Sequence, residues 1–102
     1  MSISYDKDAN SKRFVFQLFV AGDESHSKTA RENLRELCES HIPGSYEIHI
    51  VDVFKSYNLA LENGIFLTPA LIRVSPEPRT TIFGDLSDAE EVLRAMLFTG
   101  GE

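Results

Sequence analysis

Residues 80–98 have the sequence TTIFGDLSDAEEVLRAMLF, which predicts a strand, a sharp turn and a helix in succession. Ile82 and Phe83 favour a β-strand, because branched and aromatic side chains pack well on a pleated surface. Gly84 and Asp85 predict a turn, since glycine tolerates positive φ and aspartate hydrogen-bonds its own backbone. We therefore expect the strand to end at Phe83 and a helix to follow the turn.

The expected helix has a start, a stop and an apolar stripe. Ser87 lies three residues before Glu90, which is the spacing of a capping box. In a capping box the serine hydroxyl accepts the backbone N–H of the glutamate, and the glutamate carboxylate accepts the backbone N–H of the serine. Asp88 adds negative charge at the positive end of the helix dipole. Glycines at 100–101 are expected to end the helix. The apolar residues at helical spacing form one stripe: Ala89, Val92, Leu93, Met96 and Leu97.

Length and composition indicate one globular domain. The chain has 102 residues, of which 42% are hydrophobic and 25% charged, and this is enough for a single core. Its net charge of -6 argues against a nucleic-acid partner, which requires a basic surface. No apolar run approaches the ~18 residues of a membrane span, so no membrane partner is expected. The chain starts without an apolar signal segment and has one cysteine, so we expect a cytoplasmic protein.

Residues 1–12 are polar and unpatterned, which predicts a flexible N-terminal segment before a domain at 13–102. Residues 13–20 are almost all apolar, which is typical of a strand buried on both faces at the centre of a sheet. Apolar residues at helical spacing predict a helix over 25–41. The run 46–54 begins with alternating polar residues, so we expect a strand at an exposed or edge position.

The second half of the chain predicts a short helix and a hairpin. Residues 56–63 form the short helix, with a cap at Ser56 or Asn58, and residues 70–74 and 79–83 form two strands joined by a proline-rich turn. The predicted order is therefore βαβαββα. A mixed four-stranded sheet with helices on both faces is the thioredoxin-like arrangement, in which a proline such as Pro69 is often cis.

The sequence offers no group typical of catalysis. A thioredoxin-like oxidoreductase carries Cys-x-x-Cys where the first strand meets the first helix, but residues 24–27 read Glu-Ser-His-Ser. Cys38 lies on the apolar stripe of the helix and is expected to be a buried filler. Asp85 is expected to form a turn rather than to pair with Asp52. His26, His41 and His49 share no metal-ligand spacing, so we expect neither a metal nor a cofactor nor enzyme activity.

Four blocks of the sequence stand out: LFVAG at 18–22, Tyr46 with IVDV at 50–53, LTPAL at 67–71 and IFGDLSD at 82–88. Together they resemble the KaiB family, in register from about Phe14 to Leu97. The resemblance implies a non-enzymatic protein that binds the hexameric ATPase KaiC and modulates its phosphorylation cycle, in the circadian clock or in a simpler timing or stress pathway. The alternative is an adaptor in stress response or signalling that does not depend on KaiC.

The resemblance also implies two folds for one chain. One is an oligomeric, usually tetrameric, ground state ordered βαββααβ, and the other is a thioredoxin-like monomer that docks on KaiC. Self-association to a dimer or tetramer is therefore a further expectation. The positions that the resemblance makes candidates for fold switching or partner binding are Ser27, Tyr46, Asp52, Pro69, Gly84, Asp85, Ser87, Asp88, Ala95 and Leu97.

The chain departs from the clock-type pattern at several charged positions. Thr80 and Thr81 stand where arginines are typical, and His49 and Glu32 stand where lysines are typical. The usual Thr-Pro-Asn-Ser after the first strand keeps only its final serine, Ser27. Because complementary charge sets partner choice and association rate, these changes leave open a divergent KaiC or another partner.

The last helix also departs from that pattern, with Ala95 and Leu97 where clock-type members tend to have glycine and an acid. Alanine favours a helix over glycine by ~1 kcal/mol, a roughly fivefold shift in a two-state equilibrium. We therefore predict that the thioredoxin-like form is more populated here, and that Ala95→Gly shifts the equilibrium back about fivefold. Circular dichroism and size measurement in solution test this. Unaltered helix content and oligomer size would contradict it.

Overall fold

The computed structural model describes residues 13–98. The segment 1–12, expected to be flexible, and the glycines at 100–101 lie outside the described residues. The structure confirms the predicted βαβαββα order and ends in a helix, so it is not the alternative βαββααβ fold. Its elements are β1 (Phe14–Val20), α2 (Ser25–His41), β2 (Tyr46–Asp52), α3 (Tyr57–Glu62), β3 (Ala70–Ser75), β4 (Thr80–Phe83) and α4 (Ala89–Leu97).

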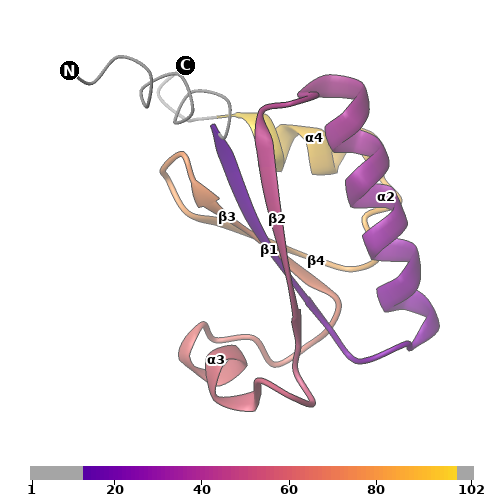
Figure 1. Cartoon of the computed structure of the whole chain (residues 1–102), viewed down its shortest axis with the longest axis vertical. Coiled ribbons are helices and arrows are strands. Elements are labelled where there is room, and N and C mark those ends of the chain that lie inside the picture. The colour runs from indigo at the N-terminus through magenta and orange to yellow at the C-terminus, as the bar shows by residue number, and fades with distance from the viewer. Residues whose placement is uncertain (1–12, 99–102) are drawn as a thin grey trace.

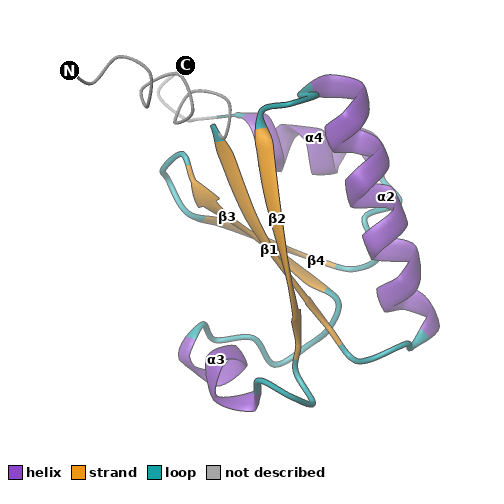
Figure 2. Cartoon of the chain, viewed as in Figure 1, coloured by secondary structure: helices purple, strands orange, loops and turns teal. Residues whose placement is uncertain are grey.

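The four strands form one mixed sheet in the order β2-β1-β3-β4 (Figure 2). β1 pairs in parallel with β2 and antiparallel with β3, which pairs antiparallel with β4. The predictions of a central first strand and an edge second strand are confirmed. The second strand is shorter than the predicted 46–54 because the N–H groups of Lys55 and Ser56 donate to the Asp52 carbonyl and turn the chain.

Helices cover both faces of the sheet, as predicted: α2 and α4 lie on one face and α3 on the other (Figure 1). Because successive side chains of a strand point to opposite faces, β1 contributes to two cores. Phe16 and Leu18 pack under α2 and α4, whereas Phe19 packs on the side of α3. None of the helices within residues 13–98 has the length and apolar character to cross a membrane.

The turn between β4 and α4 corrects the predicted capping box. Asp88 is the N-cap, and its Oδ1 accepts the N–H of Glu91 at 3.2 Å. The N–H of Ser87 instead donates to Asp85 Oδ1 at 3.1 Å, so Ser87 belongs to an aspartate turn and the helix begins one residue later than predicted. The backbone here is left-handed at Leu86, with φ of 65°, which costs an L-residue roughly 1 kcal/mol. Burial of the Leu86 side chain in the core offsets that cost.

Arg73 is a charged residue inside the core. It lies on β3, is 1% exposed, and points toward α4. Its Nη1 donates to the carbonyl oxygens of Met96 and Phe98 at 3.0 and 2.5 Å, and its Nη2 donates to that of Pro78 at 2.7 Å. Loss of solvent around the guanidinium lowers its pKa.

Within residues 13–98 every acceptor of Arg73 is a carbonyl or hydroxyl oxygen, and its Nε has no partner. The carbonyl oxygens at the C-terminal end of a helix carry partial negative charge. Here they balance the charge of the guanidinium in place of a carboxylate. A planar guanidinium can reach the end of α4 and the β3–β4 turn at once. Arg73 therefore fastens the last helix to the sheet.

We predict that Arg73→Met lowers the free energy of unfolding by about 2–4 kcal/mol, because it leaves several carbonyl groups without their charged donor. Urea unfolding gives the size of the loss, and hydrogen exchange of the α4 amides shows where it occurs. The matched control is Arg94→Met. Arg94 is exposed, and its ion pair with Glu90, at 3.7 Å, should contribute about 0.5 kcal/mol or less to the free energy of unfolding. Equal losses for the two variants would show that Arg73 does not hold α4.

Candidate protein-binding site

Large apolar side chains gather on the segments that follow β2. Phe54 is 76% exposed, Tyr57 65%, Leu61 44% and Phe66 77%. They surround a hollow of about 580 Å³, and we call these four residues the apolar cup. The cup lies beyond the carboxyl ends of β1 and β2, at the α3 end of the molecule (Figure 1). Its floor is formed by Val53, Ala60 and Ile65.

The short helix α3 can bury only one side. Ala60 and the partly buried Leu59 pack with Phe19 and Ile72 of the sheet. The remaining apolar residues of α3, Tyr57 and Leu61, are exposed. An exposed apolar surface on an ordered framework is typical of an interaction site rather than of an incompletely packed core.

Asp52 holds the framework of the cup in place. Its Oδ1 accepts the N–H of Gly22 at 3.2 Å and the N–H of Phe54 at 3.0 Å, which joins the loop after β1 to the loop after β2. Gly22 has φ of +55° and lies against the Phe54 ring, so that a Cβ at this position would be 3.5 Å from the ring. The position of Phe54 is therefore fixed by the hydrogen bond from its backbone N–H to Asp52 and by the contact of its ring with Gly22.

The N-terminal turn of α2 is closed by Glu24. Its carboxylate accepts the N–H groups of His26 and Ser27, each at 3.0 Å, and lies 2.8 Å from His26 Nδ1. These bonds lower the pKa of Glu24 to about 2, and the Glu24 carboxylate raises the pKa of His26. Ser27 is buried, and its Oγ accepts the N–H of Ala21 at 3.0 Å. Residues 24–27 are thus tied together by hydrogen bonds at the place where a dithiol would lie.

The Thr68–Pro69 bond is cis, and the Pro69 carbonyl accepts the N–H of Gly84 at 2.9 Å. Asn33 Nδ2 of α2 donates to the Asp85 carbonyl at 2.9 Å. The turn before α4 is therefore bound both to the proline loop and to α2. This brings five of the candidate positions to the same end of the sheet: Ser27, Asp52, Pro69, Gly84 and Asp85.

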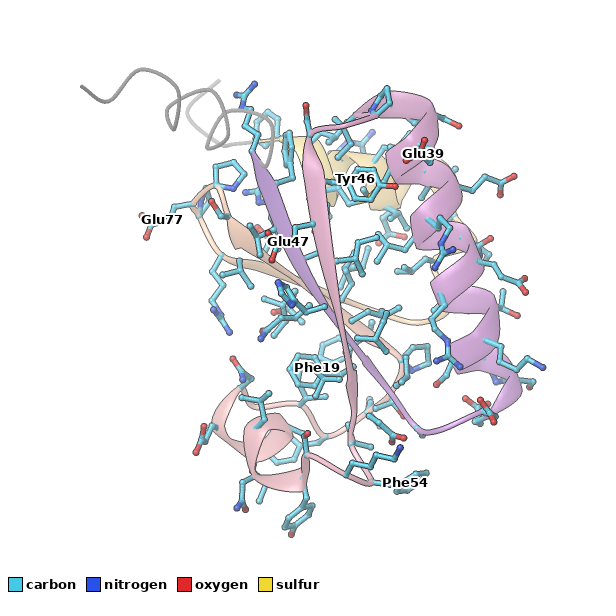
Figure 3. All side chains as sticks on the ribbon, in the orientation of Figure 1. Phe19, Glu39, Tyr46, Glu47, Phe54 and Glu77 are labelled. Atoms are coloured by element: carbon cyan, nitrogen blue, oxygen red, sulfur yellow. The ribbon has the colours of Figure 1, made fainter. Side chains whose placement is uncertain are left out.

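Two of the other candidates, Ser87 and Asp88, lie on the same turn as Gly84 and Asp85, whereas Tyr46, Ala95 and Leu97 lie elsewhere. Tyr46 is at the opposite end of β2 from Phe54 (Figure 3), where its hydroxyl donates to Glu39. Ala95 lies on α4 beside Arg73, and Leu97 is partly buried against the core of that face. Ser87 and Asp88 are exposed at the start of α4.

The cup is not predicted by the sequence. The predicted strand 46–54 includes Phe54, and residues 65–67 lie between predicted elements. One signal was present: Ile65, Phe66 and Leu67 are consecutive apolar residues in a loop, and a loop can bury few of them. In the structure Ile65 is buried, whereas the other two are exposed.

The cup presents exposed apolar side chains, whereas the cysteine of the chain is out of reach of solvent. Cys38 is fully buried, as predicted, and burial raises the pKa of its thiol to about 12. Within residues 13–98 no group of three or more His, Cys, Asp or Glu side chains is placed to hold a metal ion. The fold and the site together define a thioredoxin-like domain that presents an apolar surface near its cis proline.

Comparison with known proteins identifies the family. The KaiB domain model matches residues 17–97. The chain is 44% identical over 82 residues to the circadian clock oscillator protein KaiB of Prochlorococcus marinus strain NATL2A, covering 80% of this chain and 77% of that protein. It is 42% identical over 82 residues to the KaiB protein of Trichodesmium erythraeum, covering 80% and 79%. The chain belongs to the KaiB family.

Solved structures support the same fold. The N-terminal domain of Synechococcus elongatus SasA has a TM-score of 0.69 at 22% identity, covering 89% of this chain and 90% of that domain. The thioredoxin Deadhead of Drosophila melanogaster has a TM-score of 0.68 at 16% identity, covering 91% and 86%. At these identities the likeness concerns the fold alone, and it confirms the predicted thioredoxin-like arrangement.

We predict that Glu24 stabilises the fold in a pH-dependent way. A carboxyl with a lowered pKa contributes stability above its unfolded value, near 4.5, and loses it as pH falls toward the folded value of about 2. Urea unfolding between these two pH values should therefore show a smaller pH dependence in Glu24→Gln than in the unmodified chain. Glu36→Gln on the same helix is the control and should leave the dependence unchanged, since Glu36 accepts none of these N–H groups. The same slope in Glu24→Gln and the control would contradict the assignment.

Proposed function

We propose that this chain is a non-enzymatic regulator of the KaiB type, which binds a KaiC-type hexameric ATPase through the apolar cup and modulates its phosphorylation and timing cycle. The observation that carries the proposal is the cup itself: aromatic and aliphatic side chains held outward on an ordered framework. Membership of the KaiB family, and relatives described as circadian clock oscillator proteins, support this choice of partner.

The cup has the composition expected of an interaction site. Tyrosine and phenylalanine are enriched at the centres of protein interfaces, where a few residues supply most of the binding free energy. A surface that is already ordered loses little conformational entropy on binding. The hydrogen bonds of Asp52 and the contact between Gly22 and Phe54 provide this order. Ser27 adds to this order, because its Oγ accepts the N–H of Ala21, which lines the hollow.

A second candidate function is an adaptor that acts without a KaiC-type ATPase. It is favoured by the neutral side chains Thr80 and Thr81, which stand on β4 where arginines are typical of clock-type members. In this structure Thr80 bonds internally, to the Pro78 carbonyl and to Arg73. A binding experiment with the ATPase from the same organism separates the two functions.

We predict that Phe66→Ala weakens binding to that ATPase, in the presence of ATP, by about tenfold or more, as expected for a central interface residue. Phe66 is 77% exposed, so the free energy of unfolding should change by less than about 0.5 kcal/mol. Biolayer interferometry gives the affinity and urea unfolding the stability.

The matched control is Phe98→Ala, because Phe98 is also exposed but follows α4 on the other face of the sheet. Weaker binding for Phe66→Ala alone is the expected result. No binding by the unmodified chain would favour the adaptor, and equal losses for the two variants would remove the cup from the interface.

A further inference from the structure

The apolar cup has an acidic rim. In the two loops and the helix that frame it, residues 21–24 and 52–62, the Asp, Glu, Lys and Arg side chains are Asp23, Glu24, Asp52, Glu62 and Lys55. These segments therefore contain four carboxylates and one lysine. Two arginines from outside these segments offset part of this charge. Arg31 of α2 approaches Asp23 at 3.4 Å, with the Asp23 side chain 95% exposed, and Arg79 donates to the side chain of Asn63, which follows Glu62.

The rim charges are close to the apolar residues. Asp52 accepts the N–H of Phe54, Asp23 follows the glycine that touches the Phe54 ring, and Glu62 follows Leu61 on α3. Two of the carboxylates are also fixed in place by backbone N–H groups, since Asp52 bonds two of them and Glu24 bonds two more. The bonds to Glu24 lower the pKa of its carboxyl to about 2, so this carboxylate is negatively charged at neutral pH.

We propose that the cup receives an apolar segment flanked by lysine or arginine, and that these basic residues pair with the acidic rim. This inference rests on the proposed function, because it specifies the chemistry of the partner at the same site. An apolar contact alone would not select the sign of charge beside it, whereas an acidic rim attracts a basic partner and repels an acidic one. The attraction acts over about 10 Å at 0.1 M salt, so it speeds the encounter and weakens as salt rises.

The test reverses charge at the rim. Asp23→Lys/Glu62→Lys changes two exposed carboxylates that no backbone N–H in the described residues requires, and Glu36→Lys/Glu77→Lys makes the same change of net charge away from the cup. Figure 3 shows Glu77 at the end of the molecule opposite Phe54. With the KaiC-type ATPase we expect about tenfold weaker binding for the rim variant and a change within about twofold for the control. Binding of the unmodified chain should also weaken as sodium chloride rises, and this salt dependence should be lost or reversed in the rim variant.

Two synthetic peptides keep the inference testable if the ATPase is not the partner. They share a Leu-Phe-Leu centre and carry either lysines or glutamates on both sides, and amide shifts at the cup are followed by NMR. Larger shifts with the lysine peptide support the inference.

The outcomes separate the two proposals. If Phe66→Ala weakens ATPase binding but rim reversal has no more effect than the control, the acidic rim is not used and only this inference fails. If the ATPase does not bind at all, the proposed function fails and the peptides decide the inference. Equal shifts with both peptides, tighter binding by the rim variant, or a concentration-dependent dimer that Phe66→Ala abolishes would overturn it.

Discussion

The docking of the last helix depends on one buried cation. Arg73 lies under α4 with its charge balanced by the carbonyl oxygens of Met96, Phe98 and Pro78 rather than by a carboxylate. Burying a charged group without hydrogen-bond partners costs free energy. Arg73 is therefore expected to be buried only when its hydrogen bonds form together. When they are made, α4 covers Leu71 and Leu86, and the larger of the two cores is closed. The helix that the sequence predicted so clearly is therefore positioned by a residue outside it.

Local patterns predicted the elements because they depend on neighbouring residues. The apolar run at β1, the helical spacing at α2 and the prolines of the β3–β4 hairpin identify these elements without tertiary information. The misplaced features depend on competition between groups. Asp85 took the N–H of Ser87 and moved the helix start, and the turn after Asp52 shortened the second strand. The burial of Arg73 and the exposure of the cup could not be predicted, because each depends on which face α3 or α4 covers.

At the end of the sheet where β1 and β2 finish, polar and apolar residues play different structural roles. Asp52, Ser27 and Glu24 direct their oxygens inward to backbone N–H groups and hold the loops. The aromatic residues point outward and have few internal contacts. Sequence motifs made of turn and cap residues therefore locate the frame of the site, while the contact surface lies in residues that belong to no motif. The bonds from the Gly84 N–H to the Pro69 carbonyl and from Asn33 to the Asp85 carbonyl join this frame to the segment that leads into α4.

Glu24 also makes this scaffold unsuited to thiol chemistry at the start of α2. In a thioredoxin-like redox enzyme, the free N–H groups at the start of this helix would stabilise a cysteine thiolate and make it reactive. Here the Glu24 carboxylate already occupies those groups at His26 and Ser27. A cysteine grafted at either position would face a fixed negative charge, and its thiol would ionise less readily than in bulk water. Restoring disulfide chemistry to this chain would thus require removal of its helix cap as well as insertion of thiols.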